Sequence, residues 1–212
     1  MQANAERTFT ESGRRAQIVA AAIETIAEVG YQKASFAKIA KRAGLSSTGM
    51  ISYHFAGKED LVRAVTEVIV GTATTYMQDR IVAANNRPER LRAYIESNIE
   101  LIAAHPTHLR ALLDIVAAVR DSSGELEVDA SVLTSRVERI ETELRAGQRV
   151  GEFGEFDPSI MAIAITGAID ALVTSHAFGG AQQNSLTQSA RALADLFLRA
   201  AGADNVNHGS NS

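Results

Sequence analysis

The chain has 212 residues, a formal net charge of −4 and no cysteine, so disulfide bonds and thiolate metal sites are excluded. At this length it can bury a sizeable core, either as one large domain or as a small domain attached to a larger one. The first residues contain no apolar run typical of a signal peptide, and we expect a cytoplasmic protein. Apolar residues recur at helical spacing almost throughout, which predicts an all-α fold.

Charge is distributed unevenly along the chain. Residues 1–58 contain eight Lys and Arg against four Asp and Glu, whereas residues 59–212 contain thirteen against twenty-one. A basic segment attracts phosphate groups, so the distribution favours a nucleic-acid contact near the N-terminus. The alternative is that both segments simply present solvated faces.

The first helix should follow a polar segment, residues 1–12, that we expect to be disordered. It is predicted from Arg14 to about Val29, where Gly30 ends it. Its apolar stripe consists of Ile18, Val19, Ala22, Ile23 and Ile26.

The next stretch, residues 35–58, has the pattern of two short helices joined by a tight turn. Ser35 can cap the first helix, and Gly44 stops it where the backbone must turn. Ser46 or Ser47 can then accept backbone N–H groups at the start of a second helix, which runs to Phe55. This arrangement is a helix-turn-helix, whose second helix can lie in the major groove of DNA.

The same residues carry a family resemblance. The order of an IAKRAG helix, a Gly-Leu-Ser turn, a YHF cluster and GKEDL resembles the DNA-binding end of the tetracycline-repressor (TetR) family, from about Arg14 to Leu61. The resemblance implies a three-helix DNA-binding domain followed by a helical domain that binds a ligand and forms a homodimer. It further implies a transcriptional regulator, and we expect a repressor. Such a repressor would bind an inverted-repeat operator in double-stranded DNA and would be released by a small hydrophobic effector.

The helix-turn-helix supplies the candidate DNA-binding residues. We expect those that face base edges to be Ser47, Thr48, Gly49, Met50 and Ser52, with Gly49 allowing close approach. Phosphates would be held by Tyr53, His54, Lys58 and the capping serine, Ser46 or Ser47, with Lys38 on the basic side of the first helix. Ile51 and Phe55 should belong to the core, and Tyr53 should divide its ring and hydroxyl between core and phosphate.

A long helix should open at Lys58 and continue to about Ala84, so that it links the two halves of the chain. Pro88 and Pro106 separate the next two helices, and the acidic segment 121–130 is expected to be a loop. A further helix contains a stripe at Leu133, Val137, Ile140 and Leu144. We expect domains at residues 1–58 and 59–202, with a disordered tail at 203–212.

The last two predicted helices, residues 158–178 and 185–201, resemble the pair through which the TetR family dimerises. The first is apolar nearly all round and must therefore be covered on every side. A membrane span is a rival interpretation, but Asp170, His176 and Gly167 interrupt the segment, and we expect no membrane partner. A core hairpin within a monomer is the other alternative.

The effector should act on the far end of the long helix, because that helix is shared by both halves. The candidate effector residues are Tyr76, Met77, Tyr94, Asn98, Leu112, Leu113, Val116, Met161 and Thr166. They are mostly apolar and include no buried cation, which favours a neutral or weakly cationic hydrophobic molecule over a nucleotide or polyanion. The alternative is that the same residues form an ordinary filled core.

Catalytic and metal-binding patterns are scarce. Glycine-rich phosphate loops, a G-x-S-x-G elbow and HExxH are absent from the sequence, so we expect no enzyme, no metal and no cofactor. His105 and His108 flank Pro106 and are interpreted as surface or helix-end histidines. Asp170 is either a functional acid, a hydrogen-bonded structural carboxylate or a dimer contact. An all-helical enzyme or carrier, or a helical adaptor that binds protein only, remain the rival functions.

Overall fold

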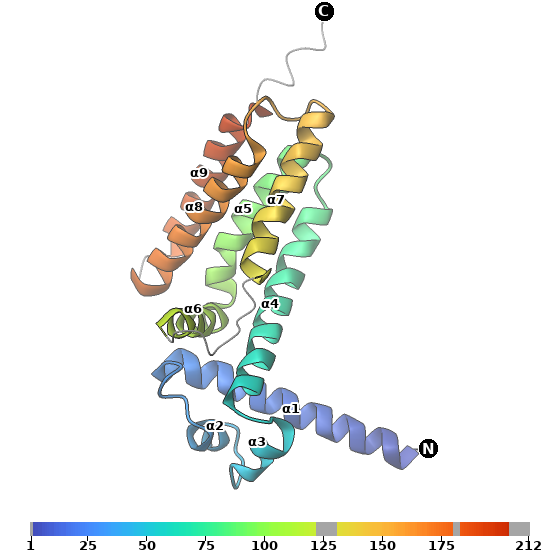
Figure 1. Cartoon of the computed structure of the whole chain (residues 1–212), viewed down its shortest axis with the longest axis vertical. Helices are drawn as coiled ribbons and strands as arrows, with labels where there is room; N and C mark the ends of the chain where they lie inside the picture. Colours follow the sequence, from blue (N-terminus) through green and yellow to red (C-terminus); the bar gives the residue numbers. More distant parts are fainter. Residues whose placement is uncertain (1, 122–130, 180–182, 204–212) are drawn as a thin grey trace, which may run out of the picture. The chain divides into compact units, whose positions relative to one another are not determined.

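The computed structural model of the chain describes residues 2–121, 131–179 and 183–203. Their regular elements are α-helices, as predicted (Figure 1). The helices are α1 (Gln2–Val29), α2 (Phe36–Arg42), α3 (Gly49–His54), α4 (Lys58–Val82), α5 (Arg87–Ala104), α6 (Pro106–Asp121), α7 (Ser131–Arg149), α8 (Pro158–Gly179) and α9 (Gln183–Ala200).

The start of α1 differs from the sequence prediction. The helix begins at Gln2, although residues 1–12 were expected to be disordered. Residues 2–7 are Gln, Ala, Asn, Ala, Glu and Arg, most of which have good intrinsic helix propensity, so this polar sequence is compatible with a helix. Most of the predicted acidic loop, residues 122–130, and the predicted tail from residue 204 lie outside the described residues.

The chain forms two compact units. Unit 1 comprises residues 1–72 and 107–128, and unit 2 comprises residues 73–106 and 129–212. The division falls inside α4, so this helix contributes to both units, whereas α6 belongs almost entirely to unit 1. The predicted domain boundary after residue 58 stays a prediction.

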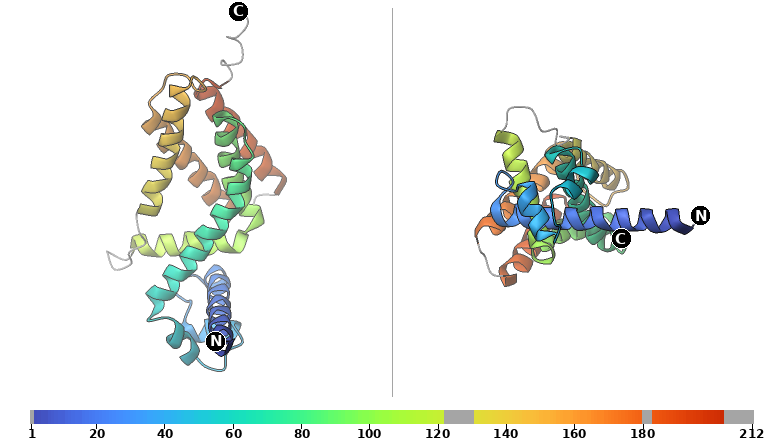
Figure 2. Two further views of the ribbon diagram at one scale, coloured as in Figure 1. Left: turned by 90° about the vertical axis from the view of Figure 1, so that its right-hand side faces the viewer. Right: turned by 90° about the horizontal axis from the view of Figure 1, so that it is seen from below.

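Unit 1 is built around the apolar face of α1. Gly30 ends α1 with a φ of 84°, a left-handed conformation that suits glycine, and the next backbone N–H, from Tyr31, donates to the Asp114 carboxylate of α6. The core draws on α1, α2, α3, α4 and α6, and includes Ile18, Ala22, Ile26, Ile39, Ile51, Phe55, Leu61, Val65, Ala111 and Ile115. Figure 2 shows the short helices α2 and α3 beside α1.

In unit 2, α5 packs against α7, α8 and α9 (Figures 1 and 2). Its start is fixed by Asn86, whose side chain accepts a hydrogen bond from the Glu89 N–H at 2.8 Å. The buried residues of unit 2 include Ile95, Ile99, Ile102, Ile140, Leu144, Ala162, Ile165, Ile169, Ala190, Ala194 and Phe197.

Candidate DNA interface and effector site

Individual residues of the helix-turn-helix fix its helix ends and its turn. Ser35 caps α2, and its Oγ accepts from the Lys38 N–H at 3.4 Å. Gly44 adopts a φ of 66°, and the following Leu45 N–H donates back to the Ala40 carbonyl at 2.9 Å. The turn is also tied to α1, because the Gln17 side-chain amide donates to the Ala43 carbonyl at 2.7 Å.

The start of α3 corrects the predicted cap. Its N-cap is Thr48, not Ser46 or Ser47, and the Thr48 side chain makes no capping hydrogen bond. The Thr48 carbonyl instead accepts from the N–H groups of Ile51 and Ser52, at 3.0 and 3.1 Å. The helix therefore begins later than the serine pattern suggested, since a favourable residue type does not by itself fix a helix end.

One face of α3 is exposed while the other anchors it to the core. Ile51 and Phe55 are buried, as expected. The exposed residues are Ser46, Ser47, Thr48, Gly49, Met50, Ser52 and Tyr53. A Cβ built on Gly49 would lie 3.4 Å from the Ser47 Oγ, an ordinary contact distance, so the turn itself does not require glycine here. The predicted base-facing residues thus lie together on an accessible helix.

Tyr53 differs from its prediction. Its ring is 70% exposed and takes no part in the core. The hydroxyl donates to the Glu11 carboxylate of α1 at 3.2 Å, and the ring meets His54 edge to face at 5.1 Å. Tyr53 is therefore held at the surface, where its predicted phosphate contact stays a prediction.

The cations near the helix-turn-helix have different surroundings. Lys38 is exposed on α2. The Lys58 ammonium donates to the Tyr31 carbonyl at 2.9 Å and lies 4.1 Å from the centre of the Tyr31 ring, and its partial burial lowers the pKa of Lys58. Arg42 pairs with Glu24 and Glu28 of α1, so it braces α2. A phosphate contact by Lys58 would have to use its remaining N–H groups.

The predicted effector residues are spread over several elements. Tyr94 and Asn98 lie one turn apart on α5, and the Asn98 amide donates to the Tyr94 carbonyl at 2.8 Å. Thr166 is buried on α8, and its hydroxyl donates to the Ala162 carbonyl. Met77 on α4 and Met161 on α8 are half-buried. Leu112, Leu113 and Val116 lie half-buried on α6 in unit 1.

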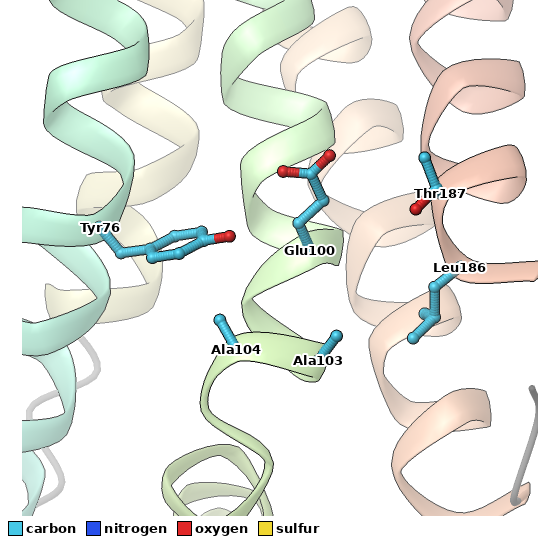
Figure 3. Close-up of a pocket in the computed structure, with 6 residues that line it drawn as sticks. All are labelled: Tyr76, Glu100, Ala103, Ala104, Leu186 and Thr187. Carbon is cyan, nitrogen blue, oxygen red and sulfur yellow. The ribbon is translucent and has the colours of Figure 1, made fainter. Parts of the chain in front are cut away.

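Tyr76 lines a separate groove of about 290 Å³ in unit 2 (Figure 3). The groove residues are Tyr76, Glu100, Ala103, Ala104, Leu186 and Thr187. Arg80 stacks on the Tyr76 ring at 4.1 Å, and its Nε lies 3.7 Å from the Glu100 carboxylate. Because of the helix period, the α5 residues of this groove lie on the side opposite Tyr94 and Asn98. The groove and the predicted α5 face are therefore different surfaces.

Unit 2 also contains a cation that the sequence analysis missed. The Arg136 side chain of α7 is only 22% exposed, and its Nη1 donates to the Asp170 Oδ1 of α8 at 3.0 Å. Burial acts to lower the pKa of Arg136, but Tyr94 and Asp170 outweigh it and the pKa is raised. Arg136 is not among the candidate effector residues, so the structure adds a partly buried cation to this part of unit 2. Asp170 is shown to be one half of this ion pair.

An exposed apolar stripe runs along α8. Ile160 and Ile163 are 64% and 54% exposed, and Ala164, Gly167 and Ala171 continue the stripe at helical spacing. On α9, Leu196 is 53% exposed. Within the described residues, α8 is also the one helix long and apolar enough to cross a membrane, by length and composition alone.

The comparisons with known proteins fit this geometry. Residues 18–65, which span the C-terminal part of α1 to the first turns of α4, match the family model "Bacterial regulatory proteins, tetR family". The HTH-type transcriptional regulator BetI of Cronobacter sakazakii is 30% identical over 197 residues, which cover 88% of this chain and 89% of that protein.

The chain belongs to the TetR family. The fatty acid metabolism regulator protein of Bacillus subtilis is 30% identical over 162 residues, 75% of this chain and 81% of that protein. The BetI 1 regulator of Chromohalobacter salexigens is 34% identical over 101 residues, so the chain spans only half of that relative. The crystal structure of FadR from Bacillus subtilis in complex with stearoyl-CoA superposes with a TM-score of 0.71 and 27% identity, covering 85% of this chain and 96% of that one.

Membership in the TetR family settles the class of function. The chain is a ligand-responsive, DNA-binding transcriptional regulator, and its relatives are regulators rather than enzymes. TetR-family regulators are soluble DNA-binding proteins, so protein rather than lipid is the natural cover for the apolar stripe of α8.

Proposed function

We propose that this TetR-family chain is a cytoplasmic repressor that binds an inverted-repeat operator as a homodimer and leaves it when an effector binds. The single observation that carries the DNA-binding part is the exposed face of α3, which is fixed from behind by the buried Ile51 and Phe55. A helix held in this way can enter the major groove without losing its packing. Residues 1–58 would form the DNA-binding domain and residues 59–202 the effector and dimerisation domain.

On α3 and its turn we assign two kinds of contact. Base edges would be read by Ser47, Thr48, Gly49, Met50 and Ser52, which are all exposed. Phosphates would be bound by Lys38, Ser46, Tyr53, His54 and Lys58. The first set should control sequence preference and the second should control affinity for any sequence.

We propose that the dimer forms through α8 and α9. The exposed Ile160, Ile163 and Leu196 provide apolar area, and the small residues Gly167 and Ala171 allow two helices to approach closely. A twofold dimer presents two copies of α3, and for this reason the operator should be an inverted repeat.

The effector class follows from the relatives. The similar FadR structure contains stearoyl-CoA, which joins a long apolar chain to a nucleotide headgroup. We therefore propose a long-chain acyl-CoA as effector, which keeps the expected hydrophobic part but departs from the expectation of a neutral or weakly cationic molecule that is no nucleotide. Its acyl chain would be buried in unit 2 and its headgroup would remain in solvent. The described apolar residues of unit 2, among them Met77 and Met161, suit such a chain.

The test uses a fluorescent duplex that contains the region upstream of the gene. We expect nanomolar binding that 1,000-fold excess of unrelated duplex does not abolish, in line with a specificity ratio of about 10³ or more. Micromolar stearoyl-CoA should then release the duplex, while CoA alone should not. If unrelated duplex competes as well as the upstream duplex, the upstream region does not contain the operator. If stearoyl-CoA does not release the duplex, only the proposed effector class is contradicted.

A further inference from the structure

Three polar side chains from three helices meet inside unit 2. They are Tyr94 of α5, Arg136 of α7 and Asp170 of α8, and these helices pack against one another. Arg136 and Asp170 form the ion pair described above, with 3.0 Å between Nη1 and Oδ1. Tyr94 is near enough to Arg136 to help raise the pKa of the guanidinium.

The hydrogen bonds of this cluster are incomplete. The Tyr94 Oη is buried and lies within reach of the Arg136 guanidinium, toward which it can only act as an acceptor. Its O–H proton has no acceptor among the described residues. A buried hydroxyl without a partner costs free energy, and native structures normally supply one from protein, water or ligand. A guanidinium has several N–H donors, and the printed bond to Asp170 uses one of them. The cluster therefore offers the Tyr94 O–H and further guanidinium N–H groups as donors to an additional acceptor.

The charges of the cluster indicate which kind of acceptor fits. Arg136 and Asp170 neutralise each other, so a further carboxylate or phosphate would add an uncompensated negative charge beside the half-exposed Asp170. A neutral carbonyl oxygen has no such cost and accepts hydrogen bonds from both a hydroxyl and a guanidinium. Asn98 and Thr166, two of the predicted effector residues, lie one turn from Tyr94 and Asp170, respectively.

We infer that the Tyr94 hydroxyl and the Arg136 guanidinium bind the neutral carbonyl oxygen of the effector, which for an acyl-CoA is the thioester carbonyl. Asp170 positions Arg136 for this contact and keeps the site neutral. The inference rests on the acyl-CoA effector class proposed above. It names the protein groups, the Tyr94 hydroxyl and the Arg136 guanidinium, that would distinguish a thioester from a ligand of equal chain length without a carbonyl.

The experiment compares stearoyl-CoA with S-octadecyl-CoA, a thioether of the same chain length that lacks the carbonyl. For the wild-type chain, stearoyl-CoA should release the operator at a roughly five- to tenfold lower concentration, the value of about one hydrogen bond. Tyr94→Phe should abolish this preference by weakening the response to the thioester alone. Its melting temperature should change little, because the substitution removes the contact with Arg136 together with a buried O–H that has no acceptor.

Arg136→Gln, combined with Asp170→Asn so that no unpaired carboxylate remains, should reduce the thioester preference in the same way. Arg139→Gln is the matched control, since Arg139 is exposed on the same helix and should leave the preference intact.

A Tyr94→Phe chain that keeps the wild-type preference would overturn the inference and indicate a water-filled or purely structural cluster. Release by stearate at lower concentration than by stearoyl-CoA would also overturn it, in favour of a carboxylate site. If neither CoA derivative releases the wild-type chain, the acyl-CoA class itself is wrong and the inference falls with it, whereas operator binding measured without ligand is unaffected.

Discussion

Ile163→Arg should separate the dimer into monomers. Ile163 is 54% exposed in the single chain and belongs to the apolar stripe of α8. Fully burying an isoleucine side chain contributes about 1.5–3 kcal/mol, so covering the remaining half contributes about 1–1.5 kcal/mol. In a twofold interface the residue occurs twice, which doubles this to about 2–3 kcal/mol.

The substituted arginines add a further cost, because each would be placed in an apolar interface without a partner. Together these effects should raise the dimer dissociation constant by roughly 100-fold or more. Sedimentation equilibrium over a nanomolar to micromolar concentration range measures this directly. Operator affinity should fall in parallel, since one subunit contacts only one half-site.

Val150→Arg is the matched control for this experiment. Val150 is 64% exposed and follows α7, away from the α8 and α9 sequences. It should dimerise like the wild type. If Ile163→Arg remains as dimeric as the control, then α8 is not the interface and the exposed stripe has another role.

Three further predictions concern binding and stability. If each subunit neutralises about three to five phosphates, log affinity for the operator should fall with log salt with a slope of about −5 to −9, and a slope near zero would contradict an interface made by α3. Asp114→Ala should lower the melting temperature of unit 1 and weaken operator binding, because it removes the acceptor of the Tyr31 N–H at the end of α1; an unchanged protein would show that this bond is dispensable. The Asn85 N–H holds the pKa of the Glu89 carboxyl below its ordinary 4.5, so its stabilising effect exists above that pH and is lost as the pH falls through the lowered pKa. Glu89→Gln should therefore lose less stability on acidification than the wild type, and equal losses in a pH series of thermal melts would contradict the capping role.

Local sequence signals predicted most of the fold. Gly30, Gly44, Pro88 and Pro106 mark helix ends that the structure also has, because they restrict the backbone directly. The sequence pattern also predicted correctly that Ile51 and Phe55 face the core. It missed the start of α1, because the polar residues at its beginning show no apolar period although most of residues 2–7 favour a helix.

The interior of unit 2 was harder to predict. Arg136 and Asp170 are 34 residues apart on different helices, and no local period indicates that they pair. Asp170 is conspicuous in the sequence because it interrupts an apolar helix. Arg136 lies on a helix with many charged residues, so the sequence does not distinguish it from the others. For Tyr53 the sequence did give a signal, but the signal wrongly predicted that the ring would contribute to the core. An aromatic residue next to core positions usually packs inward, but the register of a six-residue helix left it at the surface.

Selection of bound sequences from a random duplex library tests the central claim most directly, namely that two copies of α3 read a symmetric operator. The wild-type chain should enrich an inverted repeat whose half-site centres lie about one helical turn or a multiple of it apart. Met50→Ala should shift the enriched bases within the half-sites, because Met50 lies on the exposed face of α3. Enrichment of no motif, or of a motif without twofold symmetry that Met50→Ala leaves unchanged, would contradict the account.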